Sequence, residues 1–392
     1  MVDNQSDLSK EQFNRMQSLS SYDRWKSLRI LWLDILRGGG ILLVIIGHTI
    51  GTGIIRGPIF SFHMPLFFAV SGMTYKRPAS VSELARKIRK SFYQLIVPTL
   101  MIFLIRVVVG FYDGAFVPLT IDKFLHWLEL LLWSSGADMS AYGIRIDAIG
   151  MIWFLVCLFS ARVFYMILDY ALRNQTHSSL ILTIATTLAL IAGVLLGKFD
   201  LILPLSLDLT LIALFFYYFG KLCACKVIGK KTVELDKMMQ AHNSILAVEP
   251  VSSSIIKRFA IATIVWAGGF AVCFAVTHSY FEMACRHYPL FPVCIIVACV
   301  GFLMCMYASQ IIEAVDKRRG LKSIKFLAWC GMYSMQLFIV HCLDFIWKPL
   351  YMVSNGGVNS VLRVVLDCLV CYCIVKIMRV LQNSFEDKDR KV

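Results

Sequence analysis

The chain has 392 residues, of which 58% are hydrophobic and only 16% are charged, and its formal net charge at pH 7 is +14. Soluble globular domains average about half apolar and about one quarter charged residues, so this composition excludes an ordinary soluble domain and indicates an integral membrane protein. In a soluble protein the positive charge would suggest nucleic-acid binding. Here no nucleic-acid partner is expected, because orientation in a membrane explains the charge.

Residues 1–29 are polar and contain neither a short apolar core nor a small-residue cleavage site. They are predicted to form a cytoplasmic tail rather than a signal peptide. The following residues, 30–376, are predicted to form a single transmembrane domain, and residues 377–392 a second cytoplasmic tail.

Several segments of the domain have the roughly 20 largely apolar residues that a transmembrane helix needs. These ten segments lie at about 30–50, 58–75, 93–110, 148–168, 179–197, 203–220, 259–277, 291–312, 326–347 and 359–376. Residues 121–133 are apolar but short, and are expected to form an interfacial helix on the outer face. The predicted fold is an all-α integral membrane protein with about ten transmembrane helices and both termini in the cytoplasm.

The positive charges support this topology. Of the 39 Lys and Arg residues, 29 lie on segments predicted to be inside, 6 on outer loops and 4 within spans. Basic residues concentrate on the cytoplasmic side of membrane proteins, where they also face anionic lipid. The asymmetry therefore predicts a multi-pass protein held in the bilayer with this orientation.

The first apolar segment, LDILRGGGILLVIIGHTI, carries Asp34, Arg37 and His48. Asp34 and Arg37 are three residues apart and can pair on one helix face. Arg37 and His48 are eleven residues apart, which is about three turns, so both face the same side roughly 16 Å apart. Ionisable groups inside a span suggest function. Gly38–Gly40 between them either permit close helix packing or leave room for a narrow ligand.

The second segment contains His63 in its outer half and Ser71 towards its inner end. Pro65 is expected to disturb the helix near His63. His63 is either a hydrogen-bonded packing residue or part of a site. The basic stretch that follows includes Arg86 and Arg89, which either only orient the chain or bind a phosphate-bearing ligand from the cytoplasm.

Later segments contribute fewer polar residues. Trp153 lies near the outer end of its segment, where aromatic belts occur. His341 lies in the outer half of the ninth segment with Asp344 one turn on, so the carboxylate can orient the imidazole. Arg363 and Asp367 form an i, i+4 pair that is expected to be structural. Most of the thirteen cysteines lie in apolar runs, as small core residues do, so no metal site is expected.

These stretches together resemble the membrane-bound acyltransferase-3 family, especially the O-acetyltransferases of bacterial surface polysaccharides and the fucose 4-O-acetylase-like branch. The R-x10-H spacing of Arg37 and His48, with Asp34 upstream, is the most specific match. Further matches, in chain order, are FHMPLFFAVSG at 62–72, Arg86-x-x-Arg89, Pro98, MIWFL at 151–155 and SMQLFIVH at 334–341. The fused extracytoplasmic hydrolase-like domain of some relatives is not expected here.

The resemblance implies acetyl-coenzyme A as donor and a lipid-linked or polymerised polysaccharide, such as O-antigen, as acceptor, in the bacterial inner membrane. His48 would act as general base or transient acyl carrier. Arg37, near Asp34, would hold the donor or stabilise negative charge. Arg86 and Arg89 would meet the donor phosphates. The remaining candidates for substrate contacts are His63, Ser71, Trp153 and His341. A multi-pass transporter or exporter of a glycan precursor or small metabolite is the alternative.

Overall fold

The computed structural model describes residues 30–50, 53–112, 115–116, 120–240, 253–319, 322–351 and 356–389. The predicted tail at 1–29 and the last three residues of the predicted tail at 377–392 lie outside these ranges. Within them the chain is almost entirely helical, with two short two-stranded sheets. The prediction of an all-α membrane protein is confirmed.

Eight of the predicted spans are found as largely helical stretches in the described residues, each long and apolar enough to cross a bilayer. They are Leu31–Thr49, Ile54–Met73, Val81–Val109, Trp153–Ala171, Ser178–Lys198, Pro204–Ala224, Ser253–Thr277 and Val293–Asp316. These correspond in order to the first eight predicted segments, so hydropathy located them correctly.

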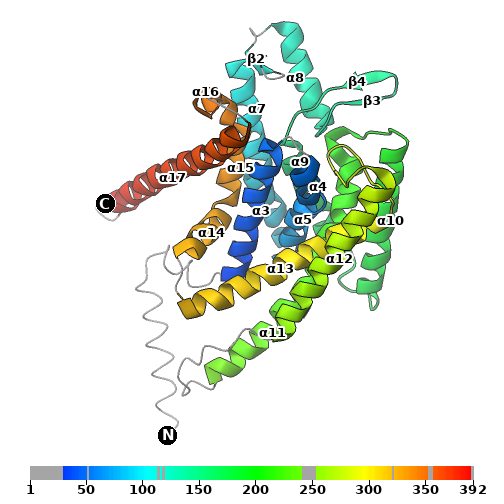
Figure 1. Ribbon diagram of the computed structural model, residues 1–392, viewed down its shortest axis with the longest axis vertical. Coiled ribbons are helices and arrows are strands. Elements are labelled where there is room, and N and C mark those ends of the chain that lie inside the picture. Colours follow the sequence, from blue (N-terminus) through cyan, green and yellow to red (C-terminus); the bar gives the residue numbers. More distant parts are fainter. Residues whose placement is uncertain are drawn as a thin grey trace.

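Helix α3 (Leu31–Thr49) lies at the centre of the bundle (Figure 1). It contacts α5 (His63–Met73), α13 (Val293–Arg319) and α14 (Lys322–Met332). A second group of helices packs around α11 (Leu207–Gln240), which contacts α5, α9 (Trp153–Ala171) and α10 (Ser178–Lys198). Helix α12 (Ser253–Thr277) packs along α13. Two helix groups thus meet at α5.

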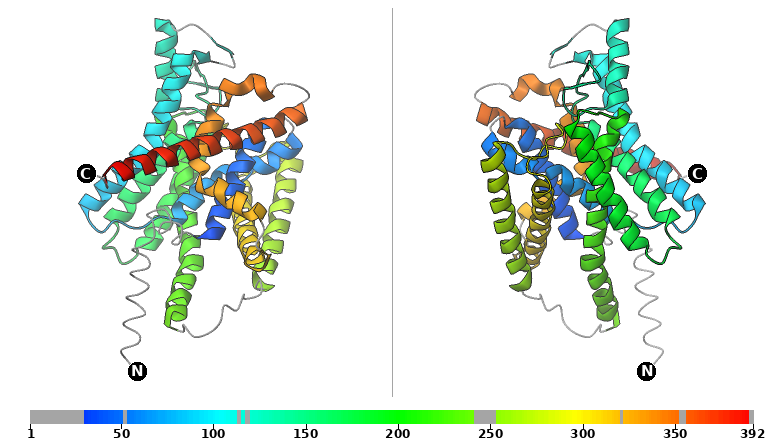
Figure 2. Two further views of the ribbon diagram at one scale, coloured as in Figure 1. Left: turned by 90° about the vertical axis from the view of Figure 1, so that its left-hand side faces the viewer. Right: turned by 90° about the vertical axis from the view of Figure 1, so that its right-hand side faces the viewer.

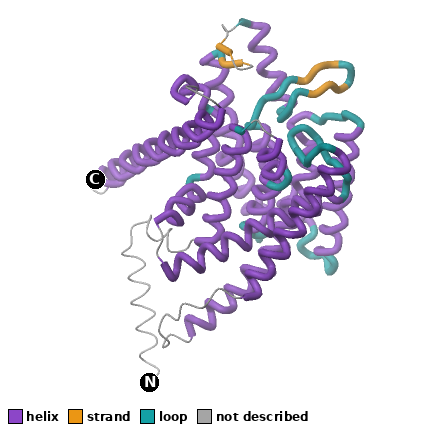
Figure 3. Tube along the Cα trace, in the orientation of Figure 1, coloured by secondary structure: helices purple, strands orange, loops and turns teal. Residues whose placement is uncertain are grey.

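The short strands gather at one end of the molecule together with α8 (Ile121–Trp133), as Figure 3 shows. Strands β1 (Phe111–Tyr112) and β2 (Ala115–Phe116) pair antiparallel, as do β3 (Met139–Ala141) and β4 (Ile144–Ile146). Helix α8 begins at Thr120, whose hydroxyl accepts a hydrogen bond from the Lys123 amide at 3.4 Å. The predicted short helix at 121–133 is confirmed as a helix.

The third predicted span begins earlier than expected. Helix α6 (Val81–Ser91) continues through the π-helical turn η1 (Phe92–Ile96) into α7 (Val97–Val109). Ser80 caps α6 by accepting a hydrogen bond from the Glu83 amide at 3.1 Å, and the Glu83 carboxylate accepts one from the Ala79 amide at 2.8 Å. This capping box defines the start of the basic helix.

The ninth predicted segment, 326–347, is broken. Helix α14 ends at Met332, α15 covers Ser334–Cys342, and η3 (Asp344–Trp347) and α16 (Lys348–Tyr351) follow. The tenth predicted segment lies within α17 (Gly356–Asp389), which crosses the bundle rather than running along α11 (Figure 2). The break between α14 and α15 changes the direction of the chain near the middle of the predicted segment.

Glycines set the crossing of α3 and α14. A Cβ added at Gly38 would lie 1.9 Å from the Leu327 carbonyl oxygen, and one at Gly331 would lie 1.7 Å from the Asp34 carbonyl oxygen. At Gly39 an added Cβ would meet no atom within 4 Å. Of the two alternatives for the glycines, packing therefore accounts for Gly38, whereas Gly39 faces open space.

Replacing Gly331 by Ala should destabilise the protein, because the new methyl group collides with backbone rather than with a movable side chain. The expected loss is about 1–3 kcal/mol, measured as a lower Tm of the purified protein in detergent. Gly39→Ala is the matched control and should leave Tm unchanged or raise it, since Ala favours a helix over Gly by about 1 kcal/mol. An equal Tm for both variants would contradict the close α3–α14 packing.

Candidate active site

Three histidines that are far apart in the sequence converge in the structure. His48 lies in the last turn of α3, His63 begins α5, and His341 lies in the last turn of α15. The ring centre of His48 is 6.2 Å from that of His63 and 6.2 Å from that of His341. We call these three residues the histidine cluster. Each was a candidate from sequence, but their convergence depends on helix packing.

A break in the second predicted span positions His63. Helix α4 (Gly53–Phe60) ends before Ser61, and α5 starts at His63. Pro65 then occupies the first turn of α5, where a missing amide proton costs no helical hydrogen bond. The predicted disturbance near His63 is confirmed, and it allows Phe60 to pack against both His48 and His63, at ring-centre distances of 5.2 and 4.4 Å.

The rings of the histidine cluster have different surroundings. The His48 side chain is exposed, whereas His63 and His341 are only 2% and 0% exposed. Nδ1 of His63 lies 3.2 Å from the Ile59 carbonyl oxygen, to which it can donate a hydrogen bond. His48 is therefore the member of the cluster that a substrate can reach first.

A buried polar network holds His341. Its Nδ1 lies 2.8 Å from Asp367 Oδ2 and 3.2 Å from Asp344 Oδ2. Asp367 also accepts a hydrogen bond from Trp347 Nε1 at 3.2 Å, and Asp344 accepts one from Arg363. The predicted His341–Asp344 contact is confirmed. The sequence did not reveal Asp367 as a partner, because its local spacing suggested a pair with Arg363.

His341, Asp344 and Asp367 are also the residues best placed to hold a metal ion, since one ligand atom of each lies within 4.8 Å of the others. Their carboxylate oxygens already accept hydrogen bonds from imidazole, indole and guanidinium groups. These bonds compensate for the burial of both carboxylates. Hydrogen bonding therefore accounts for the cluster, and the expectation of no metal stays a prediction.

The N-terminal half of α3 carries the predicted ion pair. Arg37 Nη1 lies 3.8 Å from Asp34 Oδ1, and Asp34 is buried while Arg37 is partly exposed. Arg86 and Arg89 are exposed on α6. Arg86 Nη2 lies 3.6 Å from Glu83 Oε1. Arg37, Arg86 and Arg89 make no contact with the histidine cluster through these interactions.

Two other candidates contact different residues. Ser71 is buried and accepts a hydrogen bond from Arg162 Nε at 2.7 Å. Trp153 is buried against Gly136 and Phe154. Arg162 is one of the four basic residues within the predicted spans, and nothing in its spacing identifies Ser71 as its partner. Neither Ser71 nor Trp153 joins the histidine cluster through these contacts.

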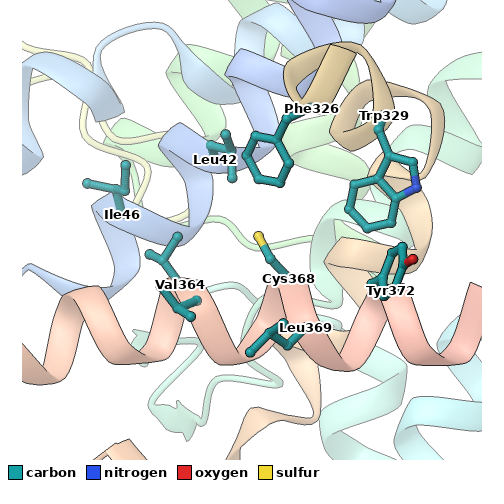
Figure 4. A pocket seen from close by; sticks show the side chains of 9 residues that line it. Leu42, Ile46, Phe326, Trp329, Val364, Cys368, Leu369 and Tyr372 are labelled. Carbon is teal, nitrogen blue, oxygen red and sulfur yellow. The ribbon is translucent and has the colours of Figure 1, made fainter. Parts of the chain in front are cut away.

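An apolar pocket of about 590 Å³ lies between α3, α14 and α17 (Figure 4). Its lining contains no charged side chain and comprises Leu42, Ile46, Phe326, Trp329, Val364, Val365, Cys368, Leu369 and Tyr372. Ile46 precedes His48 by two residues, and Cys368 directly follows Asp367. The pocket therefore lies on two of the helices that carry the site, and its surface suits hydrocarbon rather than phosphate.

The fold and site define a class: a multi-pass helical membrane protein with titratable side chains gathered inside its bundle, as expected of a functional site in a membrane. The family model for the acyltransferase domain of the acyltransferase-3 family matches residues 30–377. Since this match covers most of the chain, the protein belongs to the acyltransferase-3 family and is an acyltransferase. No match was found among curated proteins.

The difference in exposure predicts a difference in chemical reactivity. Diethyl pyrocarbonate should modify His48 faster than His63 or His341, because only His48 presents an accessible ring. Peptide mass spectrometry of the intact protein, sampled over time, measures the three rates. Equal rates at the three residues, with the protein still folded, would contradict the arrangement of the histidine cluster.

Proposed function

We propose that the protein transfers an acetyl group from cytoplasmic acetyl-coenzyme A to a sugar hydroxyl of a bacterial surface polysaccharide, such as O-antigen, at the inner membrane. The observation that carries this proposal is the exposed imidazole of His48 inside a cluster of buried polar groups, on the helix that bears Arg37 at its other end. An imidazole can serve acyl transfer as general base or as acyl carrier.

As general base, His48 would remove the proton of the acceptor hydroxyl while the hydroxyl oxygen attacks the thioester carbonyl carbon. The new C–O bond forms, the C–S bond breaks, and the proton passes to the departing thiolate. As acyl carrier, the His48 ring would attack first and then be deacylated by the hydroxyl. Both routes need a reachable, neutral ring, which the exposure of His48 supports.

The donor would be held from the cytoplasmic side. Arg86 and Arg89 project from the exposed surface of α6, and guanidinium groups match phosphate geometry. Arg37, partly exposed beside the buried Asp34, would hold the donor or stabilise developing negative charge. The resemblance of residues 62–72 to the sugar-acetylating branch of the family supports a polysaccharide acceptor rather than a protein or small metabolite.

Replacing His48 by Ala should abolish transfer, because the variant lacks the group that takes the hydroxyl proton. A loss of about 10²-fold to 10⁴-fold is expected for a general base. The measurement is the incorporation of labelled acetyl from acetyl-coenzyme A into polysaccharide, in membranes of a host with a defined surface polysaccharide, with O-acetyl signals checked by NMR.

His177→Ala is the matched control, since His177 is an exposed histidine at the N-terminal end of α10, and it should keep wild-type transfer. Full activity of the His48 variant would remove His48 from the mechanism. No labelled polysaccharide from the wild-type protein, together with transport of a glycan precursor, would favour an exporter.

Replacing both Arg86 and Arg89 by Gln should raise the KM for acetyl-coenzyme A about 10-fold, equivalent to about 1.4 kcal/mol of lost binding, with little change in kcat. The double variant Lys257→Gln/Arg258→Gln is the control, because it removes two exposed charges near the start of α12. An unchanged KM in the Arg86/Arg89 variant would show that these residues serve only orientation.

A further inference from the structure

One nitrogen of His341 is buried and unpaired. While Nδ1 lies against the two carboxylates, Nε2 has no hydrogen-bond partner among the residues that the structure describes, although the side chain is 0% exposed. A buried polar atom without a partner costs free energy, so its retention needs an explanation. The ring of His48, with its centre 6.2 Å away, provides one.

We infer that His341 is a positioning residue for His48, and that its Nε2 receives the proton that His48 takes from the acceptor hydroxyl. The inference rests on the proposed function, because it assigns a task within the same transfer. His48 is exposed, so a change in its side-chain torsions can bring one ring nitrogen towards His341 while the other faces the substrate.

The carboxylates fix the tautomer of His341. Ionised carboxylates only accept hydrogen bonds, so Nδ1 must carry the proton and Nε2 must present a lone pair. When Nε2 is protonated, Asp367 and Asp344 stabilise the resulting cation without taking the proton themselves. The same division of tasks between a carboxylate and an imidazole operates in hydrolytic triads.

His63 offers a comparison at the same ring-centre distance of 6.2 Å from His48. Its Nδ1 faces the Ile59 carbonyl oxygen, and none of its contacts among the described residues is a hydrogen bond or ion pair with a carboxylate. A carbonyl orients a ring but stabilises its cation less than a carboxylate does. The structure therefore favours His341 over His63 as the proton acceptor.

The charged and titratable groups that face the two rings come from several elements. They are Asp344 of η3, Asp367 and Arg363 of α17, Arg56 of α4 and His63 of α5. Arg106 of α7 lies close enough to Asp344 to interact with it electrostatically. Arg56 is paired with Glu282 at 2.8 Å, and Arg363 with Asp344. Asp344 therefore shares its charge between His341 and Arg363. Neither of these two arginine pairs involves Asp367, the other carboxylate that contacts His341.

The proton path balances. The hydroxyl oxygen forms its bond to the thioester carbonyl carbon and the C–S bond breaks. The hydroxyl proton enters one nitrogen of His48, and the proton on the other nitrogen passes to Nε2 of His341. The proton on Nε2 of His341 then returns to His48, and His48 gives the proton that it took from the hydroxyl to the coenzyme A thiolate. Asp367 stays ionised throughout.

The test compares Asp367→Asn with wild type in acetyl transfer as a function of pH, using the full chain in membranes and labelled acetyl-coenzyme A. Asn keeps the size of the side chain but removes its charge. We expect kcat to fall about 10²-fold, with the KM for acetyl-coenzyme A unchanged. The acid limb of the pH profile, where activity is lost as the histidines become protonated, should move to lower pH. The reason is that the protonated histidine pair loses the negative charge that stabilises it.

Two further variants separate positioning from structure. Asp367→Glu restores the charge and should return the acid limb to its wild-type position. His63→Gln should leave the acid limb in place whatever it does to the rate. A slower Asp367→Asn enzyme whose acid limb coincides with that of wild type would overturn the inference and leave Asp367 a purely structural residue.

A second measurement does not depend on activity. The chain has eight histidines, so ¹⁵N-histidine NMR of the full protein in lipid bilayers can resolve single rings. We expect the His341 signal, assigned by its loss in His341→Gln, to show protonated Nδ1 and a lone pair on Nε2. The opposite tautomer would overturn the inference even if transfer occurs. Absence of transfer by wild type with the expected tautomer would instead reject the proposed function.

Discussion

Two carboxylates, Asp344 and Asp367, lie inside an apolar helical bundle, where an unpaired charge would be strongly destabilising. They are tolerated because His341, Arg363 and Trp347 donate hydrogen bonds to them. These donors come from three elements, α15, η3 and α17. The network therefore joins the broken C-terminal helices to one another and at the same time fixes the orientation of one imidazole. Site geometry and local stability depend on the same contacts.

The α3–α14 crossing helps to bring this network close to His48. Backbone contact at Gly38 and Gly331 brings the two helices close together, and the break after Met332 then lets α15 continue at a different angle. A continuous helix through 326–347 would carry its side chains along a single axis. The break instead allows the last turn of α15 to face the last turn of α3, so that His341 and His48 approach each other.

Sequence reasoning located what depends on local chemistry. Hydropathy located the eight spans that are long enough to cross a bilayer, and spacing identified the Asp34–Arg37 and His341–Asp344 contacts. It did not reveal the hydrogen bond between Asp367 and His341. The two residues are 26 positions apart, and Arg363, one turn from Asp367, suggested a different partner. It also gave no reason to break the ninth segment, because an apolar window is insensitive to a single change of backbone direction.

Helix α3 connects the two halves of the proposed reaction. Its 19 residues extend about 28 Å, close to the roughly 30 Å of bilayer hydrocarbon, with Asp34 in its first turn and His48 in its last. In the proposed reaction, a donor held at the N-terminal end of α3 would have to pass its acyl group along this helix to reach His48. Gly38 is closed by α14, and Gly40 lies against Leu66 and Phe67, whereas Gly39 is open. Of the three glycines, Gly39 is thus the one with a surface that a slender acyl-bearing chain can follow.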